Sequence, residues 1–191
     1  MKKLYNFLKV KLCYRTYWKQ WLALLAICLL VFACSSDSSD DNTDDTVPID
    51  DTNPVYLDTN GVTIKARDWA VVGESGIING VSYTIVNRET LVNMIDNLED
   101  LTRICTSRIT NMDNLFDYKH TSSSLNNWDV SNVTTMVDMF RFAYDFNQAI
   151  GDWDVSNVTN MGRMFWGAQM FNQAIGDWDV SNVTDMGEMF S

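Results

Sequence analysis

Apolar and polar positions recur with a period of 25 residues in the C-terminal part of this chain. The segment WDVSNVTTMVDMFRFAYDFNQAIGD begins at Trp128, a close copy begins at Trp153, and a shorter copy, WDVSNVTDMGEMFS, begins at Trp178. No single copy contains an apolar segment long enough to fold alone. A fixed period of this length is typical of repeats that stack and bury their apolar sides against their neighbours.

Within each copy, the apolar positions have helical spacing. Met136, Met139, Phe140 and Ala143 are spaced i, i+3, i+4 and i+7, and their counterparts in the next copy are identical. Such positions lie on one face of an α-helix, whereas the residues that differ between the copies fall on the other face. We therefore predict a short helix over residues 135–145, with the variable positions turned outwards.

The segment before this helix predicts a strand. In the second copy, Trp153, Val155 and residues 158–161 are rich in apolar and β-branched types, and they follow a turn signal at 151–152. One strand region and one short helix per 25 residues is the plan of a leucine-rich-repeat solenoid. The predicted fold class is therefore an α/β repeat, a leucine-rich-repeat-like solenoid with one short parallel strand region and one short helix per 25-residue turn. Its expected core includes Phe146, Phe171, Met139, Met164, Val158 and Val183.

The repeated sequence also resembles a known family. The pattern FNQAIGDWDVSNVTNMGRMF is similar to the repeat of BspA-type leucine-rich-repeat surface proteins of bacteria, also described as a bacterial lipoprotein repeat, and the resemblance covers about residues 60–191. It implies a cell-surface protein that adheres to or binds host or matrix proteins, or other cells. It implies no enzymatic activity.

Residues 1–33 have the pattern of a lipoprotein signal peptide. They carry six Lys and Arg and no acid, and their apolar run WLALLAICLLVF is shorter than the roughly 20 residues of a membrane span. The sequence LLVFAC resembles the lipobox of bacterial lipoproteins, in which the cysteine, here Cys34, becomes the lipidated first residue. The alternatives are an uncleaved anchor and an ordinary signal peptide with an incidental cysteine. We predict lipidation at Cys34, which makes the membrane a partner through an N-terminal lipid anchor.

Residues 34–59 are polar and acidic and contain both prolines of the chain. This composition predicts a disordered acidic tether. An acidic run directly after a lipidated cysteine also resembles the export signal of some Gram-negative lipoproteins, which predicts an outer-membrane, surface-exposed location. The alternative is that the run is only a spacer.

Residues 60–104 are predicted to form an N-terminal capping unit. Asn79 and Gly80 are a hairpin signal, and a helix is expected from about Arg88 to Leu98 with Asn87 as its N-cap. Residues 105–191 are the predicted solenoid, which starts with a degenerate repeat that contains RITNMDNLF. We expect it to be truncated at the C-terminus, because the third copy stops before its FNQ segment.

The charge of the chain argues against nucleic acid as a partner. The whole chain carries a net charge of −11, and removal of residues 1–33 would make it −17. A chain this acidic repels phosphate backbones and anionic lipid surfaces. Of the four cysteines, Cys105 alone would remain free in the mature chain, as a packing residue and not a reactive thiol, so no disulfide is expected.

Stacked repeats would align acidic side chains about 5 Å apart, where like charges repel. A divalent cation between repeats would relieve this repulsion, since DWDVSN offers oxygen ligands at alternate positions. The glycine and the terminal glutamate of a calcium loop are missing, however, so we expect solvated aspartates or aspartates that cap turn amides, and no metal or cofactor. The two columns are Asn127, Asp152, Asp177 and Asp129, Asp154, Asp179.

Two further sets of equivalent positions in the repeats have alternative interpretations. The tryptophans Trp128, Trp153 and Trp178 could form an aromatic platform for sugar rings. We prefer core packing, because their neighbours alternate as in a strand interior. The NVT triplets at Asn132, Asn157 and Asn182 match a glycosylation acceptor. In a bacterial lipoprotein we expect them instead to hydrogen bond between repeats.

Enzyme motifs are absent from the sequence, and the single histidine, His120, has no metal-ligand partner or nucleophile near it in sequence. We expect no catalytic residues. The predicted function is that of a lipid-anchored bacterial cell-surface protein that mediates adhesion or protein-protein recognition. The alternative is a carbohydrate-binding surface lipoprotein of a glycan-uptake system that uses the tryptophan column. The candidate ligand surface, on either the helical or the sheet face, comprises Trp128, Trp153, Trp178, Arg141, Tyr144 and Trp166.

Overall fold

The computed structural model describes residues 51–190. The predicted signal segment and Cys34 lie outside the described residues. Of the predicted tether, only residues 51–59 are described, and they include strand β1 (Val55–Leu57). Regular structure thus begins before the expected boundary at residue 60, because Val55 is buried in a small core with Ile64 and Ile85. Within residues 51–190, no helix has the length and apolar composition of a membrane span.

Five short strands form two small sheets within residues 51–190. Strands β1 and β2 (Ile64–Ala66) pair antiparallel. Strands β3 (Ser75–Ile78) and β4 (Val81–Ile85) form an antiparallel hairpin, and β4 pairs in parallel with β5 (Ile104–Cys105) to complete a mixed sheet. The hairpin predicted at Asn79 and Gly80 is confirmed: both residues have positive φ, 51° and 79°, as a type I′ turn requires.

The predicted helix of this region is also confirmed, as α2 (Arg88–Asp96). The side chain of Asn87 accepts a hydrogen bond from the amide of Thr90 at 2.8 Å, which satisfies one of the free N–H groups of the first turn. The helix ends earlier than expected, because Leu98 takes a left-handed conformation with φ 56°. The amide of Glu99 then bonds back to Met94, as in a Schellman cap.

The predicted fold class is wrong. A leucine-rich-repeat solenoid has a parallel strand and a helix in every turn, but in the described residues α2 is the single helix and every named strand precedes Thr106. The chain is instead built from small antiparallel and mixed sheets, followed by turn-rich repeats. The expected strand of each copy is reduced to one isolated parallel bridge, for example between Thr135 and Asn160.

Two left-handed residues per repeat explain why the helix over 135–145 does not form. Asp138 has φ 57° and Phe142 has φ 51°, whereas an α-helix needs φ near −63°. The equivalent residues of the next copy, Arg163 and Gly167, also have positive φ, 52° and 73°. The segment is therefore a series of tight turns, and a helix cannot pass through it.

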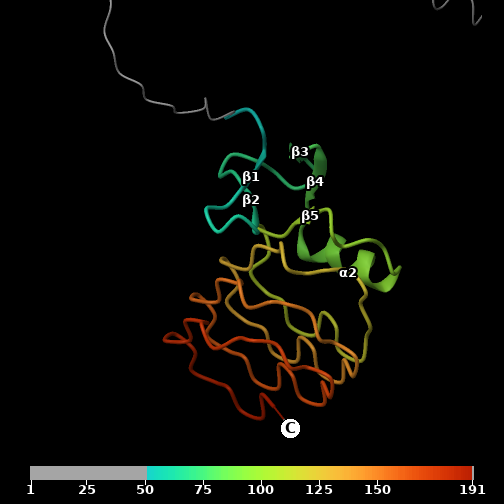
Figure 1. The fold of residues 1–191 in the computed structure, drawn as a ribbon, viewed down its shortest axis with the longest axis vertical. Helices are drawn as coiled ribbons and strands as arrows, with labels where there is room; N and C mark the ends of the chain where they lie inside the picture. Colours follow the sequence, from blue (N-terminus) through green and yellow to red (C-terminus); the bar gives the residue numbers. More distant parts are fainter. Residues whose placement is uncertain (1–50, 191) are drawn as a thin grey trace, which may run out of the picture. The chain divides into compact units, whose positions relative to one another are not determined.

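Backbone N–H groups in these turns alternate between local and inter-repeat partners. Those of Asp138 and Phe140 donate to carbonyls of the next copy, at 3.0 and 2.9 Å, whereas those of Met139 and Arg141 donate three residues back. The backbone thereby satisfies its donors without a helix or a continuous sheet. Figure 1 shows the result, with the yellow-to-red repeats running side by side as successive loops.

The main core runs through the repeats. The rings of Phe116, Phe140 and Phe165 stack one per repeat, with centroids 5.4 and 5.6 Å apart. Of the expected core residues, four are confirmed as buried, and two are partly buried against the core. The buried ones are Phe146, Met139, Met164 and Val158, and the partly buried ones are Phe171 and Val183.

Candidate functional site

The three tryptophans considered as a ligand platform lie in the core. Trp128, Trp153 and Trp178 expose 0%, 3% and 8% of their surface, and the first two rings stack with centroids 6.4 Å apart. Each indole N–H donates to a backbone carbonyl 27 or 28 residues earlier in the chain, at 3.1 to 3.2 Å. Burial removes the ring faces from solvent, so this column cannot stack against a sugar.

One of the two columns of acidic positions caps turns, namely Asp129, Asp154 and Asp179. Asp154 accepts hydrogen bonds from the amide and the hydroxyl of Ser156, at 3.1 and 2.6 Å. Asp179 accepts the amide of Ser181 at 3.0 Å, and bonding to that serine lowers the pKa of its carboxyl. The predicted capping role is thus confirmed for this column, whereas Asp152 and Asp177 of the other column are exposed. Over residues 51–190, no three acidic, histidine or cysteine side chains converge as a metal site would require.

The asparagines of the NVT triplets hold consecutive repeats together, as predicted. Asn157 donates to the carbonyl of Ser131 at 2.7 Å, and Asn182 donates to that of Ser156 at 2.8 Å. Asn132 makes the same bond one repeat earlier. These side chains are therefore part of the scaffold.

A group of exposed and half-buried aromatic and arginine side chains lies on the outer side of the repeats. The ring of Phe142 is at its centre, 4.5 Å from Tyr118, 5.8 Å from Tyr144 and 4.8 Å from Trp166, measured between centroids. Arg141 lies over Tyr118 and Phe142, at 5.6 and 5.9 Å. The aromatic-arginine surface, as we call it, comprises Tyr118, Arg141, Phe142, Tyr144, Arg163 and Trp166.

A chain of ion pairs holds the two arginines of this surface. Arg141 makes a two-pronged contact with Asp117, at 2.6 and 2.8 Å, and Arg163 makes one with Asp138, at 2.9 Å for both bonds. Arg163 lowers the pKa of the buried Asp138 carboxyl, and Asp117 raises the pKa of Arg141. Bidentate hydrogen bonds of this kind hold a guanidinium in one orientation.

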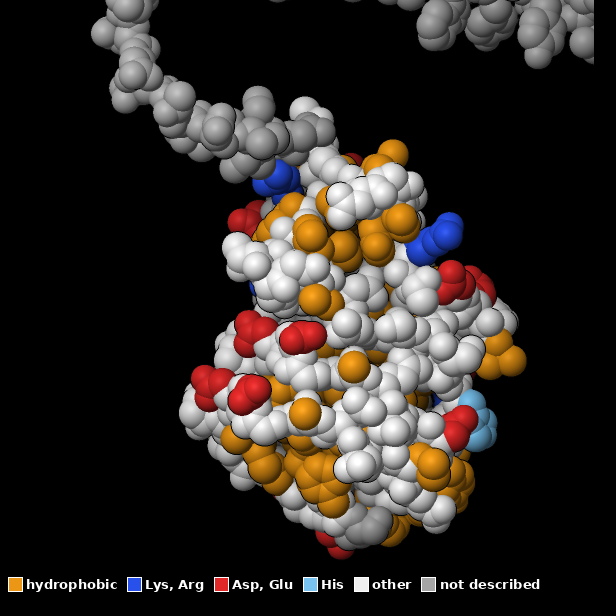
Figure 2. Space-filling view, in the orientation of Figure 1, with side chains coloured by type: hydrophobic (Ala, Val, Ile, Leu, Met, Phe, Trp, Pro, Cys, Tyr) orange, Lys and Arg blue, Asp and Glu red, His pale blue; other side chains and the backbone are white. Residues whose placement is uncertain are grey.

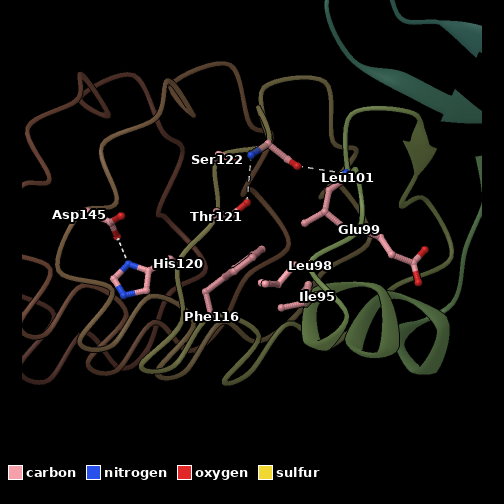
Figure 3. Close-up of a pocket in the computed structure, with 10 residues that line it drawn as sticks. Ile95, Leu98, Glu99, Leu101, Phe116, His120, Thr121, Ser122 and Asp145 are labelled. Carbon is pink, nitrogen blue, oxygen red and sulfur yellow. Dashed lines mark hydrogen bonds and ion pairs between the residues drawn. The ribbon is translucent and has the colours of Figure 1, made fainter.

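A cavity of about 370 Å³ lies between the end of α2 and the repeats. Its inner wall is apolar and includes Ile95, Leu101 and Phe116, all of which are buried. In Figure 3, Leu98 points towards Phe116, while Asp145 and His120 lie at one end of the cavity.

The polar end of this cavity contains the one histidine of the chain. Nδ1 of His120 lies 2.7 Å from Oδ1 of Asp145, and both side chains are exposed. Figure 2 shows the pale-blue histidine at the surface beside a carboxylate, with hydrophobic side chains close by. Thr121, Ser122 and Ser123 add hydroxyl groups to the wall.

Cys105, the one described cysteine, has a packing role. It is fully buried, and its sulfur lies 3.3 Å from both the carbonyl oxygen of Ile64 and the hydroxyl of Ser107. Burial raises the pKa of the thiol, which disfavours the reactive thiolate. The expected packing role is confirmed.

The structure thus divides the predicted ligand residues into two groups. Arg141, Tyr144 and Trp166 meet around Phe142, whereas the tryptophan column is buried. Sequence reasoning missed Tyr118, because it lies in the degenerate repeat, where the period is one residue shorter. One signal was available: Gly167 stands at the position of Phe142, which indicates a turn there and not a helix.

Comparison with known proteins gives a family and no activity. A family model described as "Mycoplasma protein of unknown function, DUF285" matches residues 87–191, slightly more than half of the chain. The matched region begins at the N-cap of α2 and contains all the repeats. No curated protein and no solved structure matches the chain.

Proposed function

Since the chain belongs to the DUF285 family, whose description states no activity, we propose a function from its surface chemistry. The protein is a lipid-anchored bacterial surface protein that recognises another protein, in adhesion or cell contact, through the aromatic-arginine surface. In this proposal it is a binding protein and not an enzyme, because Asp129, Asp154 and Asp179, which recur in each repeat, serve its turns.

The observation that carries this proposal is the backbone conformation beneath the aromatic rings. Tyr118 and Phe142 have φ of 55° and 51°, in the left-handed region, and the third residue of this column is Gly167. An L-residue in this region costs roughly 1–2 kcal/mol relative to glycine. Because 59% of Tyr118 is exposed, burial of its side chain cannot offset this backbone strain. Large aromatic residues at a position that suits glycine therefore indicate that their rings contact a binding partner.

The composition of the surface is that of a protein-binding hot spot. Tyrosine, tryptophan and arginine are the types most enriched where a few residues supply most of the binding energy. Here Tyr144 and Trp166 flank Phe142, and Arg141 is held by Asp117. Side chains already fixed by ion pairs and ring contacts lose little entropy when a partner binds.

The glycan-binding alternative depended on the tryptophan column, which is buried. A sugar would have to use Tyr144 and the half-buried Trp166 instead. We therefore treat carbohydrate as the competing outcome of the binding experiment.

The location follows from residues outside the described part of the chain. Lipidation at Cys34 would anchor the mature protein, and the acidic run after it would direct it to the outer face of the outer membrane. The high net negative charge is consistent with this arrangement, because it keeps the binding region away from anionic headgroups.

The proposal is tested by binding of the full chain to immobilised extracellular-matrix proteins and, in parallel, to soluble polysaccharides. We expect saturable binding to at least one protein, and a loss of tenfold or more in affinity for Tyr144→Ala and Trp166→Ala, as for hot-spot aromatics. Trp69→Ala is the matched control, because Trp69 is 52% exposed and lies outside this surface. Binding to polysaccharide alone, or equal losses in all three variants, would contradict the proposal.

A further inference from the structure

Leu98 is a large apolar residue whose backbone closes the end of α2 but whose side chain is not packed in the core. It is 83% exposed and follows the C-terminal cap of α2 with φ 56°. Glycine is the residue that normally takes this position, because a Cβ is strained there. Leucine thus carries both backbone strain and an exposed apolar side chain, with no burial to offset either. Such an outlier at the mouth of a cavity indicates contact with a ligand.

The cavity beside Leu98 combines an apolar wall with carboxylates. Figure 3 places Leu98 next to Phe116, with Asp145 at one end and Glu99 at the other. Oδ1 of Asp145 contacts His120, but Oδ2 has no hydrogen-bond partner among the described residues. Glu99 likewise makes no ion pair within residues 51–190. The exposed side chain of Leu98 can therefore pack against an alkyl chain while an oxygen of Asp145 accepts a hydrogen bond.

We propose that this cavity binds the side chain of a lysine or arginine from a partner protein. The alkyl stem lies along Leu98, and the cationic head reaches Oδ2 of Asp145. The two basic residue types share this combination of an apolar stem and a charged head. The partner protein that supplies this side chain is the one that the proposed function requires. The biological role of the cavity therefore rests on the proposed function. The cavity itself can be tested independently.

Three other ligand classes fit less well. An anion would be repelled by Asp145 and Glu99 and by the net charge of the chain. A sugar would find no exposed aromatic face, since Phe116 is fully buried. A purely apolar side chain would cover the free oxygen of Asp145 without giving it a hydrogen bond, which is unfavourable.

The experiment titrates the full chain, labelled with ¹⁵N, with blocked single amino acids that differ only in the side chain. The probes are the N-acetyl methylamides of lysine, arginine, norleucine and Nε-acetyllysine. Norleucine keeps the stem of lysine but lacks the charge. We expect saturable shifts of the Leu98, Thr121 and Asp145 amides with lysine, arginine or both, with Kd on the order of millimolar. Norleucine and Nε-acetyllysine should bind about fivefold more weakly or worse.

Two variants separate the stem contact from the charge contact. Leu98→Asn removes the apolar chain while suiting the left-handed backbone, so it should not lower the Tm, yet it should weaken lysine and norleucine alike by about threefold or more. Asp145→Asn should weaken lysine and leave norleucine unchanged. Asp152→Asn, an exposed carboxylate outside the cavity, is the matched control and should change neither.

Equal affinities for lysine and norleucine, or no saturable shift with any basic probe, would overturn this inference. Neither result would affect the proposed function, which is tested by Tyr144→Ala and Trp166→Ala on protein binding. Conversely, a cavity that binds the lysine probe in a chain that binds no matrix protein would reject the proposed function alone.

Discussion

Gly167→Ala tests how closely neighbouring repeats approach each other. Gly167 has φ +73°, and a Cβ there would lie 2.5 Å from Cδ1 of Phe142 in the preceding repeat. An L-residue with a left-handed backbone conformation costs about 1–2 kcal/mol relative to glycine. An extra carbon in a closely packed contact costs about 1–3 kcal/mol. We expect the free energy of unfolding to fall by about 2–5 kcal/mol, measured by urea unfolding of the full chain.

Two other glycines separate the two contributions. Gly61 also has φ +73°, but nothing lies within 4 Å of its added Cβ, so Gly61→Ala measures strain alone. Gly176 has neither a left-handed φ nor a neighbour within that distance, so Gly176→Ala should change stability by less than about 0.5 kcal/mol. The difference between the losses at Gly167 and Gly61 is then the steric part.

A double-mutant cycle identifies the neighbour responsible. In a Phe142→Ala background the obstructing ring is absent, so Gly167→Ala should cost there only what Gly61→Ala costs. We therefore expect a coupling energy of about 1–3 kcal/mol between positions 142 and 167. Equal losses for Gly61→Ala and Gly167→Ala, or a coupling near zero, would refute the packing of Phe142 over Gly167.

Two further predictions concern the ion-pair chain and the anchor. Arg163 depresses the pKa of Asp138 in the folded state, so this carboxylate contributes stability that is present above its unfolded pKa of about 3.9 and is lost as the pH falls through the lower folded value. Asp138→Asn, which suits the left-handed backbone, should therefore lower the free energy of unfolding by about 1–3 kcal/mol at pH 7 and by progressively less below pH 4, and a loss independent of pH would contradict this. Separately, incorporation of labelled fatty acid should disappear in Cys34→Ala, while Cys28→Ala retains it; label that persists in Cys34→Ala would show that the anchor was wrongly assigned.

The burial pattern of the repeats could be predicted from the sequence, but their backbone could not. Met136, Met139, Phe140 and Ala143 are all buried, as their i, i+3, i+4, i+7 spacing predicted. Consecutive turns closed by i to i+3 hydrogen bonds give nearly the same spacing of inward residues as a helix, so periodicity alone does not distinguish the two. What distinguishes them is positive φ at Asp138 and Phe142, for which the one sequence signal was the glycine at the equivalent position 167.

The candidate site was predictable only in part, for a related reason. Arg141, Tyr144 and Trp166 were selected because they vary between copies, and the structure brings them together around Phe142. Leu98 could not be recognised, because the sequence placed it inside a helix, where an exposed leucine has no special meaning. Its left-handed conformation becomes apparent only once the end of α2 is known.

The way in which the repeats are joined explains how a recognition surface can vary without loss of the fold. Consecutive repeats are held by backbone N–H groups and by side chains that are identical between copies, such as Asn157 and Asn182. None of these bonds depends on which side chain stands at the outer positions. The same backbone carries Phe142 in one copy and Gly167 in the next, both at positive φ. Outer residues can therefore differ from repeat to repeat wherever the neighbouring side chains leave room, which they do not at Gly167. A binding surface can be assembled there from neighbouring copies while the core beneath it stays unchanged.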